Sequence, residues 1–289
     1  MIDVVMLLGG ICDCRQFGSE KACWVDLVLA QQWAICKYFV RMADYDGYNY
    51  KKFRELASND ALSVYEKIGF PVSYRKNSEG FIFEDILSKV PILREERHLN
   101  VLDIGSGCSF LQKSISSICK ANGHTLFLAD SPEMLRLTED LPYVRKYAGF
   151  FPDETFEAIY ADSGGLDVII CYSVFHSVFS EGRAWQLVDS ILKLMTEGSQ
   201  CIMGDIPNIS KRKRFFASGT GVKFHKSFMH TNEIPKVFFN QPEFGRIDDA
   251  VLLSIIMRCQ YFGFDAYIVP QDKRLPFANR RDDILIRRL

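Results

Sequence analysis

The most constraining feature of this chain is an apolar segment that leads directly into a glycine turn. Residues 101–108 read Val-Leu-Asp-Ile-Gly-Ser-Gly-Cys, and Asp103 stands two positions before the first glycine. The apolar residues from Leu111 to Ile118 then repeat with helical spacing, and Gly123 follows where a helix commonly ends. Because glycine lacks a Cβ and lets a ligand approach the backbone, this strand, turn and helix predict a cradle for a nucleotide-type cofactor.

Two classes of cofactor compete for such a turn. A dinucleotide fingerprint has a third glycine, and Phe110 occupies that position here. The carboxylate of Asp103 would repel a pyrophosphate, whereas it suits a ligand that carries an ammonium and a sulfonium group. Residues 102–107 resemble the first motif of class I methyltransferases, which bind S-adenosylmethionine and release S-adenosylhomocysteine (SAH). The resemblance implies that Asp103 holds the amino group of the cofactor. The residues expected against its methionine part are Gly105, Ser106 and Gly107.

A second predicted strand, 125–129, ends at Asp130. In nucleotide-binding folds a carboxylate at this position holds the ribose hydroxyls, so we expect Asp130 to bind the ribose. A helix is predicted to start at Pro132, so Asp130 or Ser131 could instead cap this helix, and both roles are compatible. The segment after Asp130 also resembles the family, which implies that Ser131 and Met134 flank the adenine.

Two further predicted strands also end in polar residues. Residues 166–171 are nearly all apolar, as in a central parallel strand buried on both faces, and 201–203 lead to Asp205. The chain after the first of these strands resembles the fourth methyltransferase motif, where it crosses the methyl-transfer end of the cofactor. The residues that this places at the cofactor are Cys171, Tyr172 and Ser173. Because ligands of parallel sheets bind at the carboxyl ends of the strands, all these segments are expected at one edge.

Alternating strands and helices predict an α/β fold with a mostly parallel sheet. An amphipathic helix is expected from Trp185 to Met195, ending at Glu197-Gly198, and another over 247–262 with Ala250, Leu253 and Ile256 or Met257 on its buried face. The last two predicted strands are 264–269 and 283–286. Their linker is too short for a crossover helix, so they are expected to be antiparallel neighbours. The resemblance implies a seven-stranded Rossmann-like methyltransferase sheet with a terminal antiparallel hairpin over residues 95–289.

Residues 1–94 are expected to form an N-terminal helical cap. Helical patterns cover 24–42, the surroundings of 62–68, and 81–90 before Pro91. In the family that the sequence resembles, such additions usually build the acceptor pocket. A dimerisation or purely structural element is the alternative, so a homo-oligomer is compatible with the sequence.

Residues 208–245 are long for a connection and are expected to form a lid or binding loop. The segment is rich in basic residues, which favours an anion clamp beside the methyl group, with a solvated basic helix as the alternative. The residues expected to bind an anionic acceptor are Lys211, Arg212, Lys223 and Lys226.

Methyl transfer to a hydroxyl requires a general base within hydrogen-bond reach of the acceptor. Three residues are candidates, namely His176 after the fourth strand, Asp205 after the fifth, and His225 in the lid. A histidine at position 176 could equally pack against the cofactor without a chemical role, and Asp205 could fix the lid.

The composition of the chain limits the kinds of partner and the cellular location that we expect for it. The net charge of −1 does not suggest a general nucleic-acid binder. Nine irregularly spaced cysteines predict reduced, packed thiols and a cytoplasmic location, with no disulfide framework and no metal site. No apolar run reaches the roughly 18 residues of a membrane span.

The sequence therefore predicts an S-adenosylmethionine-dependent methyltransferase that acts on a small or medium polar acceptor. The expected acceptor atom is an oxygen on a sugar or on a phosphorylated or anionic metabolite. A protein or RNA methyltransferase, a non-catalytic binder with this fold and an NAD-type oxidoreductase are the alternatives.

Overall fold

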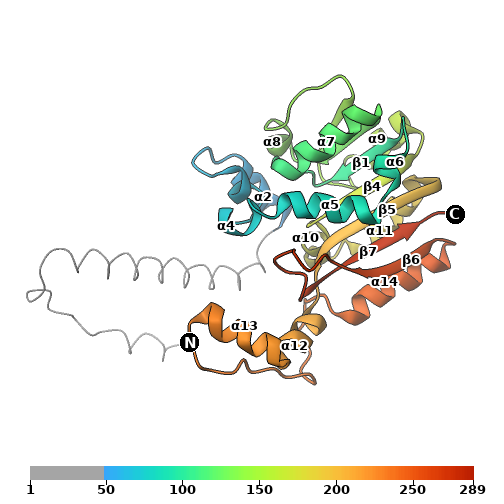
Figure 1. Cartoon of the computed structure of the whole chain (residues 1–289). Helices are drawn as coiled ribbons and strands as arrows, with labels where there is room; N and C mark the ends of the chain where they lie inside the picture. The colour runs from blue at the N-terminus through green and yellow to red at the C-terminus, as the bar shows by residue number, and fades with distance from the viewer. Residues whose placement is uncertain (1–48) are drawn as a thin grey trace, which may run out of the picture. The chain divides into compact units, whose positions relative to one another are not determined.

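The structure is a computed structural model that describes residues 49–289 (Figure 1). The helix expected over 24–42 lies outside the described residues. A seven-stranded sheet forms the centre of the described chain, with strand order β3-β2-β1-β4-β5-β7-β6. The strands are β1 (Asn100–Ile104), β2 (Thr125–Asp130), β3 (Val144–Ala148), β4 (Leu166–Tyr172), β5 (Met195–Pro207), β6 (Asp265–Pro270) and β7 (Arg281–Arg287).

The first five strands are parallel, while β7 runs antiparallel to both β5 and β6. The predicted α/β sheet with its terminal antiparallel hairpin is therefore confirmed. Every residue of β4 except Asp167 is buried, as expected of a strand with helices on both sides. The order of the strands changes direction beside β1, so the carboxyl ends of β1 and β4 flank the point where parallel sheets commonly bind ligands.

Two hydrophobic cores lie on opposite faces of the sheet, because successive side chains of each strand point to opposite sides. Val168 and Ile170 of β4 belong to one core, whereas Ile169 and Cys171 belong to the other. The first core also contains buried residues of α5 (Glu79–Lys89), α6 (Ile92–Glu95) and α7 (Phe110–Asn122). The second core contains residues of α9 (Phe156–Ser163), α10 (Phe175–Ser180), α11 (Ala184–Leu194) and α14 (Asp249–Tyr261).

Two details of the predicted helices are wrong. Helix α11 ends at Leu194, and β5 begins at once with Met195, which pairs with Leu166 of β4. Glu197 and Gly198 therefore lie within β5 and do not end the helix. The pattern missed this because strand pairing starts before the polar residues.

In α14 the buried face is Leu252, Ile255, Ile256 and Cys259. Leu253 and Met257, which were expected on that face, are 53% and 69% exposed. Both faces of this helix are rich in apolar residues, so the helical period alone did not distinguish them.

The described part of the predicted cap consists of short helices that precede β1. They are α2 (Tyr50–Ala57), α3 (Val64–Lys67), α4 (Val72–Arg75), α5 and α6. Ile86 of α5 and Leu93 of α6 are fully buried in the same core as the sheet. The helices expected near 62–68 and over 81–90 therefore correspond to α3 and α5, while the division between a cap and a cofactor domain at residue 94 stays a prediction.

The long segment after β5 begins as two helices, α12 (Ile209–Ala217) and α13 (Gly219–Met229), drawn in orange in Figure 1. The phenylalanines Phe215, Phe216, Phe224 and Phe228 form a chain of ring contacts between and along these helices. Residues 231–238 have no regular structure. Within residues 49–289, no helix is both long and apolar enough to cross a lipid bilayer.

Candidate functional site

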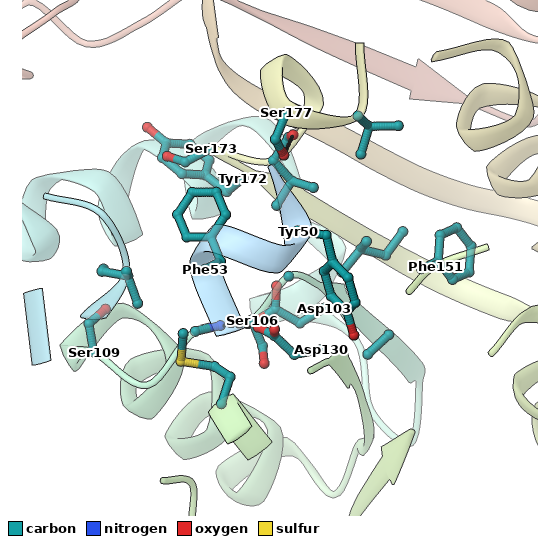
Figure 2. A pocket seen from close by; sticks show the side chains of 18 of the residues that line it. Tyr50, Phe53, Asp103, Ser106, Ser109, Asp130, Phe151, Tyr172, Ser173 and Ser177 are labelled. Atoms are coloured by element: carbon teal, nitrogen blue, oxygen red, sulfur yellow. Dashed lines mark hydrogen bonds between the residues drawn. The ribbon is translucent and has the colours of Figure 1, made fainter. Parts of the chain in front are cut away.

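A cavity opens at the carboxyl ends of β1, β2 and β4, around the glycine turn (Figure 2). Eight residues expected at the cofactor line it, namely Asp103, Gly105, Ser106, Gly107, Asp130, Met134, Tyr172 and Ser173. Ser131 and Cys171, which were also expected there, are not part of its lining. Segments that are distant in sequence therefore meet in one pocket, as their positions after predicted strands suggested.

The glycine turn leaves little space for a side chain at Gly105 or Gly107. Gly105 has φ +65°, a conformation that other residues rarely adopt, and a Cβ placed there would lie 2.4 Å from Cγ2 of Val174. Gly107 has φ +64°, and its Cβ would lie 3.0 Å from Ile68. The two glycines thus let the turn pass close to neighbouring elements while its main chain faces the pocket.

Asp130 braces this turn. Its Oδ2 accepts a hydrogen bond of 2.9 Å from the backbone N–H of Gly107, and its Oδ1 accepts one of 2.6 Å from that of Ser131. Burial raises the pKa of Asp130 to about 6, although both hydrogen bonds oppose this shift. Ser131 caps α8 (Pro132–Leu135) by accepting from Met134 N–H. Because Ser131 performs the capping, the remaining lone pairs of Asp130 are available to a ligand.

Asp103 is a buried acid of the pocket. Its side chain is 4% exposed, and burial, followed by the charge of Asp130, raises its pKa well above the usual range. No cationic side chain among residues 49–289 forms an ion pair with it. The hydroxyl oxygen of Ser106, in the same turn, is buried and has no hydrogen-bond partner within the described chain. The pocket therefore offers an acidic site and an unsatisfied hydroxyl, which an ammonium group would complete.

Phe110 stands where a dinucleotide fingerprint has its third glycine, and it is 55% exposed. Its ring therefore does not separate α7 from the sheet. The carboxylate of Asp103, rather than the bulk of Phe110, therefore disfavours a dinucleotide at this turn.

Helix α2, which lies within the predicted cap but was not itself predicted from the sequence, supplies a wall of the pocket. Tyr50 and Phe53 line the cavity, and Figure 2 shows both side chains projecting from this helix. The guanidinium of Arg54 donates two hydrogen bonds of 2.8 and 2.9 Å to Glu133 of α8, which fixes α2 beside the ribose side of the pocket. The ring of Tyr50 packs edge-on against Phe150, 5.0 Å away.

Arg75 is the one guanidinium that lines the described pocket, and it comes from α4. Its Nε donates to Glu79 at 3.3 Å, and its Nη1 lies 3.8 Å from Asp205. Glu79 also accepts from the hydroxyl of Ser109 at 2.6 Å and from the N–H of Leu111 at 3.1 Å, at the start of α7. A carboxylate is favourable at a helix N-terminus, so Glu79 connects the glycine turn to Arg75.

The three general-base candidates all lie outside the pocket lining. Asp205 is connected to it, because it accepts a 2.5 Å hydrogen bond from the hydroxyl of Ser173, and it also pairs with Arg281. Ser173 and Asp205 both have φ near +60°, at 62° and 60°, a strained conformation that is often found at functional sites. Burial lowers the pKa of His176 to about 4, with Arg281 adding to the effect. His225 contacts the ring of Phe216.

Three of the four consecutive basic residues at the start of α12 form ion pairs within the described chain. Lys211 bonds to Asp282 at 2.6 Å, Lys213 lies 3.1 Å from Glu243, and Arg214 pairs with Asp249. Arg212 is exposed and contacts the ring of Phe216 at 5.6 Å, Lys223 is exposed and Lys226 is half-buried. None of the four predicted acceptor-binding residues lines the pocket.

Comparison with known proteins supports the architecture. No protein-family model matches the chain, and no curated protein matches it either. Among solved structures, the plantazolicin methyltransferase BpumL in complex with a triazolic desmethylPZN analog and SAH shares 12% identity and a TM-score of 0.51, over 83% of this chain and 100% of BpumL. BpumL in complex with SAH gives 13% identity and a TM-score of 0.50, over 82% and 95% of the two chains. The described chain therefore has the fold of these class I methyltransferases.

Proposed function

We propose that this protein is a methyltransferase that uses S-adenosylmethionine. The observation that carries the proposal is the position of two carboxylates in the pocket at the glycine turn, Asp103 without an ion pair in the described chain and Asp130 at the adjacent strand end. A buried acid without a counter-charge is costly unless a ligand supplies one. Of the nucleotide cofactors considered, S-adenosylmethionine carries positive charge where Asp103 needs it.

The pocket residues match the chemical parts of this cofactor. Asp103 would accept from the ammonium group, and Asp130 would accept from the ribose hydroxyls. Arg75 would bind the carboxylate, which the sequence analysis did not foresee. Met134 and Phe151, which both line the pocket, supply apolar surface for the adenine. Bound there, S-adenosylmethionine supplies a methyl group already activated on a sulfonium.

Because the methyl donor is already activated, the main task of the chain is to orient the two reactants, which can contribute about 7–11 kcal/mol. Ser173, Val174 and Ser177 line the pocket after β4, on the side that the sequence assigns to methyl transfer. The Ser173–Asp205 hydrogen bond gives Asp205 a route to a proton released at this side. We therefore favour Asp205 as the base. The ring nitrogens of His176 are buried away from solvent, and His225 contacts Phe216 outside the pocket lining.

We further propose a small or medium polar acceptor that is methylated on oxygen. Helices α2 and α4 support the small size of the acceptor, because they contribute Tyr50, Phe53 and Arg75 to the pocket. These side chains limit the space beside the cofactor.

Calorimetric titration of the purified protein with SAH and with NAD tests the cofactor. We expect micromolar SAH binding and no heat of binding with NAD. NAD binding without SAH binding would overturn the proposal. Transfer of a radiolabelled methyl group from S-adenosylmethionine into fractions of a cell extract would then identify the acceptor class.

A further inference from the structure

Arg280 differs from the other basic residues near α12. It immediately precedes β7 and is half-buried, yet no carboxylate in residues 49–289 forms an ion pair with it. Its guanidinium instead lies over two phenylalanine rings, 4.7 Å from the centre of Phe277 and 5.7 Å from that of Phe224. Phe224 belongs to α13 and Phe277 to the β6–β7 connection, so Arg280 lies between the two elements.

Positive charge accumulates around Arg280. Burial, the adjacent Arg281 and then Arg212 lower the pKa of Arg280 to about 10. Arg281 is neutralised by Asp205, whereas Arg212 has no ion pair within the described chain. The half-buried guanidinium of Arg280 and the exposed one of Arg212 therefore repel each other, and neither has an ion pair within residues 49–289, an arrangement that an anionic ligand would relieve.

This site lies on the methyl-transfer side of the pocket. Arg281 pairs with Pro207 at the carboxyl end of β5, so Arg280 lies at the same edge of the sheet as the glycine turn. Contacts connect the next residue, Arg281, to the pocket, because Arg281 pairs with Asp205, and Asp205 accepts from Ser173 in the pocket lining. Phe70 also lines the pocket, and the guanidinium of Arg281 lies over its ring, 6.0 Å from the ring centre.

We propose that Arg280, assisted by Arg212, binds a carboxylate or phosphate group of the methyl acceptor. This inference rests on the proposed methyltransferase function and adds the chemical class of the acceptor. It replaces the predicted clamp of Lys211, Arg212, Lys223 and Lys226 with a pair that retains only Arg212. Arginine is suited to the role, since its planar group forms paired hydrogen bonds with both anions.

The test is a calorimetric titration of the protein with phenyl phosphate, benzoate and neutral benzamide. Each titration is done in the absence and in the presence of saturating SAH. We expect wild-type protein to bind one or both anions and not benzamide. Arg280→Met should weaken anion binding by about tenfold or more, because it removes a charged hydrogen-bond partner. Arg212→Met should weaken it less. The preferred anion separates a phosphorylated acceptor from a carboxylic one.

Arg274→Met is the matched control. Arg274 lies in the same connection and stacks on Phe81 at 4.6 Å, but it is paired with Asp272 and Glu84. Its substitution should leave anion binding unchanged. Arg280→Met should also keep the unfolding midpoint of the ligand-free protein at or above that of wild type, because an uncompensated charge is removed.

Two results would overturn the inference, namely no anion binding by wild-type protein or equal anion affinity in wild type and Arg280→Met. If Arg280 served only in packing, Arg280→Met would keep the anion affinity of wild type and would unfold at a lower midpoint. Failure of SAH to bind wild-type protein would instead overturn the proposed function, and it is measured separately.

Discussion

Two charged clusters were expected to bind ligands, namely the acidic pair Asp103 and Asp130 at the glycine turn and the basic run 211–214 at the start of α12. They differ in whether their charges are paired within the described chain. Asp103 is buried without an ion pair in the described chain. In the basic run, Lys211, Lys213 and Arg214 are each paired with a carboxylate from another element. The first arrangement leaves a charge for a ligand, while the second fastens α12 to β7, α14 and the segment before α14.

This contrast gives a physical criterion for reading charged motifs. Exposed ion pairs contribute little, about 0–1 kcal/mol each, and they satisfy both partners. A buried charge without a partner is unfavourable in the ligand-free protein, so its presence suggests a function that compensates for it. By this criterion the buried Asp103 and the half-buried Arg280 are functional candidates, and Arg214, whose pair with Asp249 is exposed, is structural.

The largest effect is expected for Asp103→Asn. Loss of a charge-assisted bond to the ammonium group should weaken SAH binding by roughly 10–100-fold. Binding of 5′-methylthioadenosine, which has the adenosine part but no amino acid, should not change. Calorimetry with both ligands separates the two parts of the pocket.

The same variant should unfold at an equal or higher temperature without ligand, since a buried acid is removed. Equal losses for both ligands would indicate a damaged pocket. Unchanged SAH affinity would show that Asp103 does not bind the ligand, and the proposed difference between the acidic pair and the basic run would then be wrong.

The next effect concerns pH. The pKa of Asp130 is about 6, above the usual 3.8, because of burial. Between these values the folded protein binds the extra proton, so the stability of the ligand-free protein should fall as pH rises through this window. Ribose hydroxyls need the ionised acceptor, so SAH affinity should show the opposite trend, with a loss of about tenfold from pH 7 to pH 5.

Titrations with SAH across pH 5–8 measure this dependence. Asp130→Asn should bind both SAH and 5′-methylthioadenosine weakly and show a flatter pH profile. A wild-type affinity that is constant over the same range would remove Asp130 from the ribose site.

A smaller effect is expected for Arg75→Met. Arg75 already contacts Glu79 and Asp205, so its charge is partly compensated. SAH affinity should decrease roughly fivefold and 5′-methylthioadenosine affinity should not, because only SAH has a carboxylate. If both affinities fell together, Arg75 would support the pocket wall without binding the carboxylate.

The smallest effect is expected for Arg214→Gln. Its exposed pair with Asp249 should contribute no more than about 1 kcal/mol to stability, and SAH binding should remain as in wild type. Chemical denaturation and calorimetry measure the two quantities. A tenfold loss of SAH affinity would show that the basic run does act on the cofactor pocket.

Much of the sheet could be predicted from the sequence because its central strands are apolar and lead into polar residues. The edge strand β3 is the exception. It contains Arg145 and Lys146 and has no fully buried residue, so its pattern does not resemble that of the central strands. The start of β7 was also placed too late, because Arg281 and Asp282 are charged but buried.

The candidate site divides in the same way. Residues that follow strands, such as Asp103 and Asp130, were predictable because the sheet brings strand ends together. Tyr50, Phe53 and Arg75 were not, since only tertiary packing of α2 and α4 brings them to the pocket. The role proposed for Arg280 depends on its having no ion-pair partner among residues 49–289, a property that no local pattern encodes.

The most direct test of the account is a crystal structure of the protein grown with SAH. We predict SAH at the glycine turn, with its amino group within hydrogen-bond distance of Asp103 and its ribose hydroxyls on Asp130. A turn that remains empty at saturating SAH, or one that binds a pyrophosphate there, would contradict it.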